Sequence, residues 1–440
     1  MVVGTFHTSI VLAEPGKIHC GTHDPVQGHI NIRYAPSPKN VGAELFGPLQ
    51  VFVILHGRAK TKIWKSNGQS TSIYRGRAKL FSRQVNIYND SVRATPGETK
   101  LYSFSIPFPE NDEPVLDQRG HVLDRDDFPN DLRFNISPHQ PLPPSFQSSY
   151  HGFAHRYESF VEYRVGVEIV TPKLHVDVTK PTEYQEPIVH YERPRVAPSA
   201  DKSGKTTSRR GYISVRNELL LPESDRPSGF KQKTKALLGA GHFPTYAFDW
   251  VCLAPNQIHL GQPVCFEVKI KPRKNECTAT LIPEVRLKHF RMKISAHTQV
   301  RAKRALFHSP GSEGSYTVWE MMGAIDSHEP FSKANDNTKI VNTDAIGSRG
   351  AGSFASSFTT FNISQTYTTK ISFAFELAGK VNNIDQEYAT IVHPPLEISR
   401  HPTLTTAGPS SQSSNLENRA SDLPRYEPLS PYEQQSTSAN

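Results

Sequence analysis

Cysteine is scarce in this chain, with four residues among 440: Cys20, Cys252, Cys265 and Cys277. Four scattered cysteines are too few for a disulfide framework, so we expect a reducing compartment such as the cytosol. Long apolar runs are also missing, and no stretch approaches the about 18 consecutive apolar residues that indicate a membrane-spanning helix. The first fifteen residues lack a basic start and a small-residue cleavage site, which argues against a secretory signal.

Methionine is equally rare, with 4 residues, whereas proline is abundant, with 35 residues against 27 glycines. Proline is a poor guest inside a helix, and the many Val, Ile, Tyr, Phe and Thr residues favour strands. The charge is mixed, since 50 Lys and Arg against 42 Asp and Glu leave a net charge of +8. This modest surplus indicates affinity for acidic surfaces without naming a nucleic acid or a membrane as the partner.

Apolar and polar residues alternate along many short segments, which is the pattern of a strand with one buried face. The clearest case is 160–170, whose apolar face would hold Val161, Tyr163, Val165, Val167 and Ile169. Comparable segments occupy 26–34, 49–55, 59–64 and 100–106, then 245–253, 263–270, 284–294, 366–377 and 387–392. Many short strands separated by turn residues predict an all-β protein made of antiparallel sandwiches.

Two changes of composition divide the chain. From about residue 193 the sequence becomes basic and rich in Ser and Thr, which predicts a linker or long loop over 196–243. Residues 401–440 contain twelve Ser or Thr and five Pro, so we expect a disordered tail there. The strand-like segments then fall into two sandwiches, at 1–195 and 244–400, the second with a long flexible loop at 333–357.

The order of the strand-like blocks carries a resemblance. The N-terminal blocks are VQGHINIRY (26–34), GPLQVFVILHGRAKTKIW (47–64), TPGETKLYSFSIPFP (95–109), LPPSF (142–146) and a strand beginning near Tyr157. In this order they resemble the arrestin superfamily, specifically the arrestin-related adaptors (alpha-arrestins) of fungi. NQIHLGQPVCFEVKI (256–270) is similar to the opening of the arrestin C-domain, and PPLEISRHP (394–402) to its closing strand. The resemblance implies the arrestin fold, two tandem antiparallel immunoglobulin-like β-sandwiches.

The tail contains a proline–tyrosine motif made of Leu423, Pro424, Arg425, Tyr426 and Glu427. WW domains bind short polyproline II segments in an aromatic-lined groove, with a tyrosine two residues after the proline filling its own pocket. Pro424 would dock between the groove aromatics and Tyr426 would fill the pocket, with Leu423 in place of the usual first proline. A second candidate, Pro431 and Tyr432, has the wrong spacing and is weak.

In alpha-arrestins such motifs recruit a WW-domain HECT ubiquitin ligase, which ubiquitylates membrane transporters and marks them for endocytosis. The resemblance therefore implies a cytoplasmic adaptor at the plasma membrane or endosomes that recognises cytosolic regions of transporters or receptors. Two alternatives remain open: an arrestin-like signalling or sorting scaffold without ligase recruitment, and a β-sandwich enzyme. The enzyme would need a clustered acid pair or nucleophile, which the sequence does not offer, so we expect no catalysis and no cofactor.

Basic residues gather on strand-like segments of both halves. They are Lys60, Lys62, Arg75, Arg77 and Lys79 in the first half and Arg286, Lys288, Arg291 and Lys293 in the second. At alternate positions they would project from one face of a sheet. Such a face could meet acidic transporter tails or anionic lipid head groups, and a solvated face balanced by nearby acids is the plain alternative. Few aromatic residues interleave with these cations, so we expect no nucleic acid partner.

Three further motifs are better explained without a ligand. Residues 203–206 resemble part of a phosphate-binding loop but lack its first glycine, because position 199 is Ser. Residues 143–146 imitate a proline–tyrosine motif within a segment expected to enter a strand. His19, Cys20, His23 and Asp24 are close in sequence but have no second cluster to complete a metal site, so we expect an ordinary loop.

Overall fold

In the part of the chain that the structure describes, four β-sheets contain nearly all the regular structure, and the fold there is all-β. The structure is a computed structural model. It describes residues 4–66, 68–114, 131–135, 137, 139–152, 155–171, 176–179, 186–193, 206–227, 243–302, 311–324, 331, 338–345 and 355–394.

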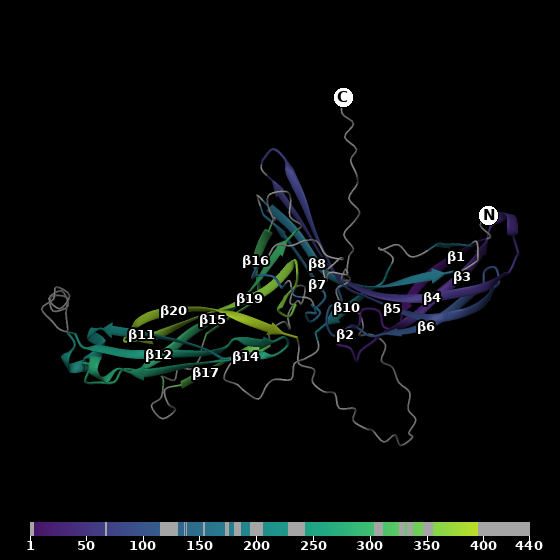
Figure 1. Cartoon of the computed structure of the whole chain (residues 1–440). Helices are drawn as coiled ribbons and strands as arrows, with labels where there is room; N and C mark the ends of the chain where they lie inside the picture. Colours follow the sequence, from purple (N-terminus) through teal and green to yellow (C-terminus); the bar gives the residue numbers. More distant parts are fainter. Residues whose placement is uncertain are drawn as a thin grey trace, which may run out of the picture. The chain divides into compact units, whose positions relative to one another are not determined.

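Two of the sheets form what we call the N-terminal sheet pair (Figure 1). The first has the order β6 (Thr99–Ile106), β3 (Val26–Pro36), β1 (Gly4–Leu12), β9 (Val176–Thr179). The second has the order β2 (Ile18–Cys20), β10 (Ile188–Glu192), β8 (His155–Val170), β4 (Leu45–Ser66), β5 (Thr71–Ala94), with β7 (Phe146–His151) also on β8. Both sheets contribute to one apolar core, which includes Phe6 and Ile30 of the first sheet and Val53 and Tyr163 of the second.

The other two sheets form the C-terminal sheet pair. One has the order β11 (Thr206–Arg216), β12 (Thr245–Pro255), β14 (Pro263–Pro272), β17 (Thr338–Ala345). Its companion has the order β13 (Gln257–His259), β20 (Lys380–His393), β19 (Ile363–Leu377), β15 (Val285–Arg301), β16 (Gly311–Ala324), with β18 (Phe358–Thr359) also on β19. A second core holds Phe248, Trp250 and Phe266 against Phe373 and Phe375.

Helical structure in the described residues is limited to single 3-10 turns. These are η1 (Pro38–Asn40), η2 (Glu218–Leu220), η3 (Glu223–Asp225) and η5 (Lys274–Glu276). Within the same part of the chain, no helix has the length and apolar character needed to cross a membrane.

The strands predicted from alternation are confirmed, and two of them are parts of one longer strand. Segments 49–55 and 59–64 both belong to β4, which runs without a break from Leu45 to Ser66. Gly57 lies between the two predicted segments but faces the core, and an added Cβ would lie 2.6 Å from the Tyr163 ring. This glycine therefore serves close packing of an aromatic residue inside a strand.

Two segments differ from their prediction as a linker and as a loop. β11 lies within 196–243 and pairs with β12 from Thr206 to Arg216. β11 is the edge strand of its sheet, and Arg209 and Arg210 are exposed whereas Ile213 and Val215 are buried. Because most of its residues are polar, the alternation typical of a strand is weak in this segment. β17 likewise lies within 333–357 and pairs with β14.

Residues on and beside β18 and β19, strands of the C-terminal sheet pair, also belong to the core of the N-terminal sheet pair. Ala355, Phe358, Phe361 and Ile363 are buried among residues of the first core. The rings of Phe146 and Phe358 are 5.0 Å apart in an edge-to-face arrangement. The first core is therefore incomplete without residues from near position 360.

Candidate functional site

The basic residues of the first half lie on neighbouring strands of one hairpin, β4 and β5. Along β4, Ala59, Thr61 and Ile63 are buried, while Lys60 and Lys62 alternate with them on the opposite face. This facing follows from the two-residue period of a strand, because successive side chains point to opposite sides.

The register of the hairpin places cations directly opposite one another. There are three such pairs in succession: Lys62 with Arg75, Lys60 with Arg77, and Arg58 with Lys79. We call these six residues the basic face. Side chains directly opposite on antiparallel strands have Cβ atoms about 4.5–5.5 Å apart, so like charges there destabilise the pairing.

β8 flanks β4 on its other side and supplies the neighbouring carboxylates. Glu162 is opposite Arg58 and forms ion pairs with both Arg58 and Arg164, the latter at 3.1 Å. Glu158 is opposite Lys62 and pairs with Arg156 at 2.6 Å. Among the residues of β4, β5 and β8 on this face, from the rung of His56 to the rung of Trp64, two are carboxylates and eight are arginines or lysines. Glu186, which lies outside these strands, adds a carboxylate 3.0 Å from His56 Nε2. Arg58, Lys60, Arg77 and Lys79 each have a further partner within the chain.

A hollow opens among these cations. Its volume is about 250 Å³, and it is lined by His56, Gly57, Arg58, Ala59, Lys60, Arg77, Ala78 and Lys79. The β4–β5 register shifts between Gly57 and Arg58, which marks a bulge beside the hollow. A bulge bends a strand and increases its local twist, and such features re-aim side chains near binding sites.

Apolar side chains follow the basic face toward the turn of the hairpin. Trp64 lies opposite Ile73, and Ile73 is 46% exposed. Lys62 and Arg156 each stand 4.3 Å from the centre of the Trp64 ring. The outer face of the hairpin thus changes from apolar near its turn to cationic over the next three rungs.

The second basic group lies on β15, in the C-terminal sheet pair, and the structure does not join it to the basic face. Arg286 pairs with Glu284 at 2.5 Å, and Lys288 pairs with Glu376 at 2.8 Å. Asp385 lies nearby, and its pKa is lowered by hydrogen bonds from Ser372 and Lys370 and by the charge of Arg291. These cations are interleaved with acids, as expected of a solvated sheet face.

The buried face of the hairpin rests on the end of β15. Ile63 and Tyr157 pack with Val300 and Ala302 in a small apolar cluster. Beside it, Thr61 Oγ1 donates a 2.6 Å hydrogen bond to the carbonyl oxygen of Arg301. The side of β4 opposite to the basic face therefore packs against the C-terminal sheet pair.

The contact between the two sheet pairs, which we call the junction, includes a buried cation, Arg301. Its side chain is 3% exposed, and its Nε donates to the carbonyl oxygen of Phe361 at 2.5 Å. The guanidinium lies 4.5 Å from the centre of the Phe134 ring. Burial lowers the pKa of Arg301 to about 10, partly countered by Asp131. The sequence pattern did not indicate this residue, because its contacts are distant along the chain.

A second polar contact joins the two sheet pairs near the end of β10. Ser356 Oγ donates to Glu192 Oε1 at 2.8 Å, and Arg193 Nη1 donates to the carbonyl oxygen of Ser357 at 3.4 Å. Burial raises the pKa of Glu192, and hydrogen bonds from Arg193 and Ser356 oppose that shift. Glu192 is therefore an acid of the junction whose pKa is raised because it is buried there.

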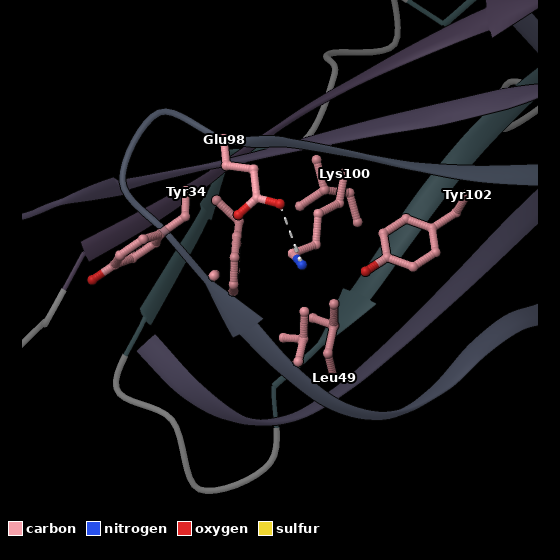
Figure 2. Close-up of a pocket in the computed structure, with 9 residues that line it drawn as sticks. Tyr34, Leu49, Glu98, Lys100 and Tyr102 are labelled. Atoms are coloured by element: carbon pink, nitrogen blue, oxygen red, sulfur yellow. Dashed lines mark ion pairs between the residues drawn. The ribbon is translucent and has the colours of Figure 1, made fainter. Parts of the chain in front are cut away.

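An opening beside β6 is too small to be a ligand site. Figure 2 shows Tyr34, Leu49, Glu98, Lys100 and Tyr102 around it, with Lys100 and Glu98 forming an ion pair at 3.6 Å. The enclosed space is about 10 Å³, which is about the room that a single water requires. Burial raises the pKa of Tyr102 to about 12.

Two of the three motifs set aside in the sequence make ordinary structural contacts, and of the third, 203–206, only Thr206 lies within the described residues. Cys20 N donates to Asp24 Oδ2 at 3.1 Å, and His19 Nδ1 lies 3.2 Å from the Asp24 carbonyl oxygen. No group of three His, Cys, Asp or Glu side chains suited to a metal ion occurs in the described part of the chain. At 143–146, Tyr163 donates its hydroxyl to the carbonyl oxygen of Pro143 at 2.5 Å.

The proline–tyrosine motif, 423–427, and the weaker pair Pro431 and Tyr432 lie outside the described residues, as does the predicted disordered tail. Comparison with known proteins adds no assignment: no family model matches the chain, and no curated protein matches its sequence.

Proposed function

We propose that this protein is an arrestin-like adaptor that joins membrane transporters or receptors to a WW-domain HECT ubiquitin ligase. Its two sheet pairs would be the tandem immunoglobulin-like sandwiches of the arrestin fold. The observation that carries the proposal is the basic face, a cationic surface on the paired strands β4 and β5. Such a surface suits the acidic cytosolic side of a membrane, where cargo tails and anionic head groups lie.

The ligase-binding part of the proposal rests on sequence. Tyr426 comes two residues after Pro424, which is the spacing that WW domains bind. Leucine at position 423 lacks the preorganisation of proline, so we expect weaker docking than for Pro-Pro-x-Tyr unless a second contact adds avidity. The adaptor would act in the cytoplasm, peripherally at the plasma membrane or endosomes, and would need neither a cofactor nor a nucleic acid.

Transporter turnover in fungal cells tests the proposed function. The chain replaces the host alpha-arrestins, and the internalisation of several plasma-membrane transporters is measured with wild type and with Pro424→Ala/Tyr426→Ala. We expect at least one transporter to be internalised with wild type and retained at the membrane with the double variant. Equal internalisation with both proteins would favour a scaffold that does not recruit a ligase.

A further inference from the structure

We infer that the outer edge of β6 binds an extended peptide segment of another protein by strand addition. This inference goes beyond the proposed function, because it depends on neither the basic face nor the tail motif. It is carried by three features of the described residues: backbone groups along β6 that no strand pairs, a sequence with little of the usual protection of an edge, and a groove beside the strand.

The hydrogen bonds of β3 show which residues of β6 face outward. β6 is the last strand of its sheet and pairs with β3 on one side. In an antiparallel pair, successive residues direct their N–H and C=O groups to opposite sides. The N–H of Ala13, next to β1, donates to the carbonyl oxygen of Gln27, so Gln27 faces β1 and the next residue, Gly28, faces Phe104 of β6.

The same alternation along β6 leaves every second residue facing away from β3. These residues are Thr99, Leu101, Ser103 and Ser105. Within the described part of the chain, their outward N–H and C=O groups meet no backbone partner. β6 therefore offers a row of donors and acceptors to which a further strand could pair.

β6 has little of the protection that keeps edge strands from pairing with other chains. Protected edges are very short, carry charges, contain a bulge or are covered. β2, β9 and β13 are three or four residues long, and β11 carries Arg209 and Arg210. β6 has eight residues in an unbroken register with β3, and its one charged side chain, Lys100, is paired with Glu98 at 3.6 Å. Residues 101–106 therefore form an uncharged edge.

A groove of about 390 Å³ lies beside this edge, between the first half of β6 and the end of β5. It differs from the small opening of Figure 2, although Lys100 and Tyr102 line both. Val92 lines the groove together with Tyr88 and Tyr102, whose ring centres are 4.8 Å apart. Leu101 also lines it and is 65% exposed. Alternate side chains of an added strand would enter the groove or lie along Leu101, and both places favour apolar groups.

An extended peptide suits this edge better than a second copy of the chain. Eight residues of strand extend over about 27 Å. A stable dimer buries about 1,200–2,000 Å² of total surface, which a single strand edge does not supply. The C-terminal residues 401–440 are poor candidates, because they contain five prolines and few large aliphatic residues. The inferred occupant is therefore a proline-free segment of a partner with apolar side chains at alternate positions.

Fluorescence anisotropy with the full chain tests the inference. The probe is a labelled peptide of about ten residues in which valine alternates with threonine, and the control peptide has the same composition with its valines adjacent. We expect the alternating peptide to bind about tenfold more tightly or better. Methylation of the backbone nitrogen at every second residue should abolish binding for one of the two alternate sets and spare it for the other, because only one set faces β6.

Variants of β6 locate the site. Ser103→Pro removes an outward N–H, which an edge strand tolerates, and should weaken binding by about tenfold or more. Ser103→Ala keeps that N–H and should bind as wild type does. Leu101→Lys adds a charge of the kind that protects an edge and should also weaken binding, with Val381→Lys, at another exposed apolar position, as its matched control. Circular dichroism and thermal melting confirm folding, and the methylated peptides and Leu101→Lys decide the question if Ser103→Pro does not fold.

Three outcomes would overturn the inference. Equal binding of the two peptides, or equal effects of the two methylation sets, would exclude strand addition. Equal binding by wild type and by a folded Ser103→Pro would place the peptide away from β6. A dimer that Ser103→Pro dissociates, seen by sedimentation in the absence of peptide binding, would assign the edge to a second copy. Pro424→Ala/Tyr426→Ala should bind the peptide as wild type does, so failure of the tail motif and failure of this site are distinguishable.

Discussion

Thr61 and Arg301 are joined by a 2.6 Å hydrogen bond from the threonine hydroxyl to the arginine carbonyl oxygen, across 240 residues of sequence. Thr61 lies between Lys60 and Lys62 on β4, so its side chain points to the junction while theirs point to the basic face. One strand therefore carries a structural contact on one side and the proposed binding surface on the other.

Loss of this hydroxyl should destabilise the protein. Thr61→Val leaves the Arg301 carbonyl oxygen buried without that donor, and we expect the free energy of unfolding to fall by about 1–3 kcal/mol. Chemical denaturation followed by tryptophan fluorescence measures the change. Thr71→Val, at an exposed position of β5, is the control and should change the stability by no more than about 0.5 kcal/mol. Equal stabilities of the two variants would contradict the role given to Thr61.

Gly76 should be intolerant of any side chain. A Cβ at this position would lie 2.5 Å from Thr61 Oγ1 and 2.8 Å from the Arg301 carbonyl oxygen. Gly76→Ala must push these groups apart, and we expect a loss of about 1–3 kcal/mol in unfolding free energy. The same denaturation assay measures it, with Ser72→Ala, at an exposed position of the same strand, as the control. A neutral Gly76→Ala would mean that the hairpin does not rest on β15 as described.

The strands were largely predictable because their burial alternates in the sequence itself. The segment 160–170 became most of β8, and 245–253 became most of β12. Only the part of β5 near residues 75–79 was expected to be a strand, although β5 is 24 residues long. Its outer face carries Arg, Lys, Ser and Asn, and its inner face contains only scattered apolar residues. A strand at the edge of its sheet tolerates such a composition, since solvent covers one side.

The junction and the opposed cations could not be predicted, because both depend on which strands pair and in which register. Sequence alternation placed Lys60 and Lys62 on one face, but nothing local indicated that Arg77 and Arg75 lie directly opposite them. Nothing in the sequence indicated Arg301, because its burial arises from residues near 134 and 361. Contacts between distant segments leave no periodic signal.

The junction should make stability depend on pH through Glu192. Burial raises its pKa in the folded protein above the ordinary value of 4.5. The folded state therefore binds the proton more tightly, and this contribution is fully present below pH 4.5 and is lost as the pH rises through the folded pKa. Glu192→Gln keeps an oxygen that accepts from Ser356 and removes the charge.

We expect Glu192→Gln to gain stability relative to wild type as the pH increases from 4 to 8. Denaturation midpoints across this range, at constant ionic strength, measure the difference. Glu158→Gln, at a carboxylate that is about 41% exposed, is the control and should show no comparable trend. A difference between Glu192→Gln and wild type that stays constant with pH would contradict the assignment.

Reversing one charge of the basic face should stabilise the hairpin. Arg75 is exposed and lies directly opposite Lys62, so Arg75→Glu replaces repulsion by attraction. We expect a gain of about 0.2–1 kcal/mol in unfolding free energy at low salt, reduced at high salt, measured by chemical denaturation at two ionic strengths. A loss of stability, or a gain that does not depend on salt, would contradict the repulsion between these two residues.

Binding of the full-length protein to purified WW domains of a HECT ligase tests the central claim most directly. The affinities of wild type, Pro424→Ala and Tyr426→Ala are compared, with Tyr432→Ala as the control because its proline is at the wrong spacing. The adaptor account predicts binding that is lost in the first two variants and retained in the control. Absence of binding by wild type, or equal binding by all four proteins, would contradict it.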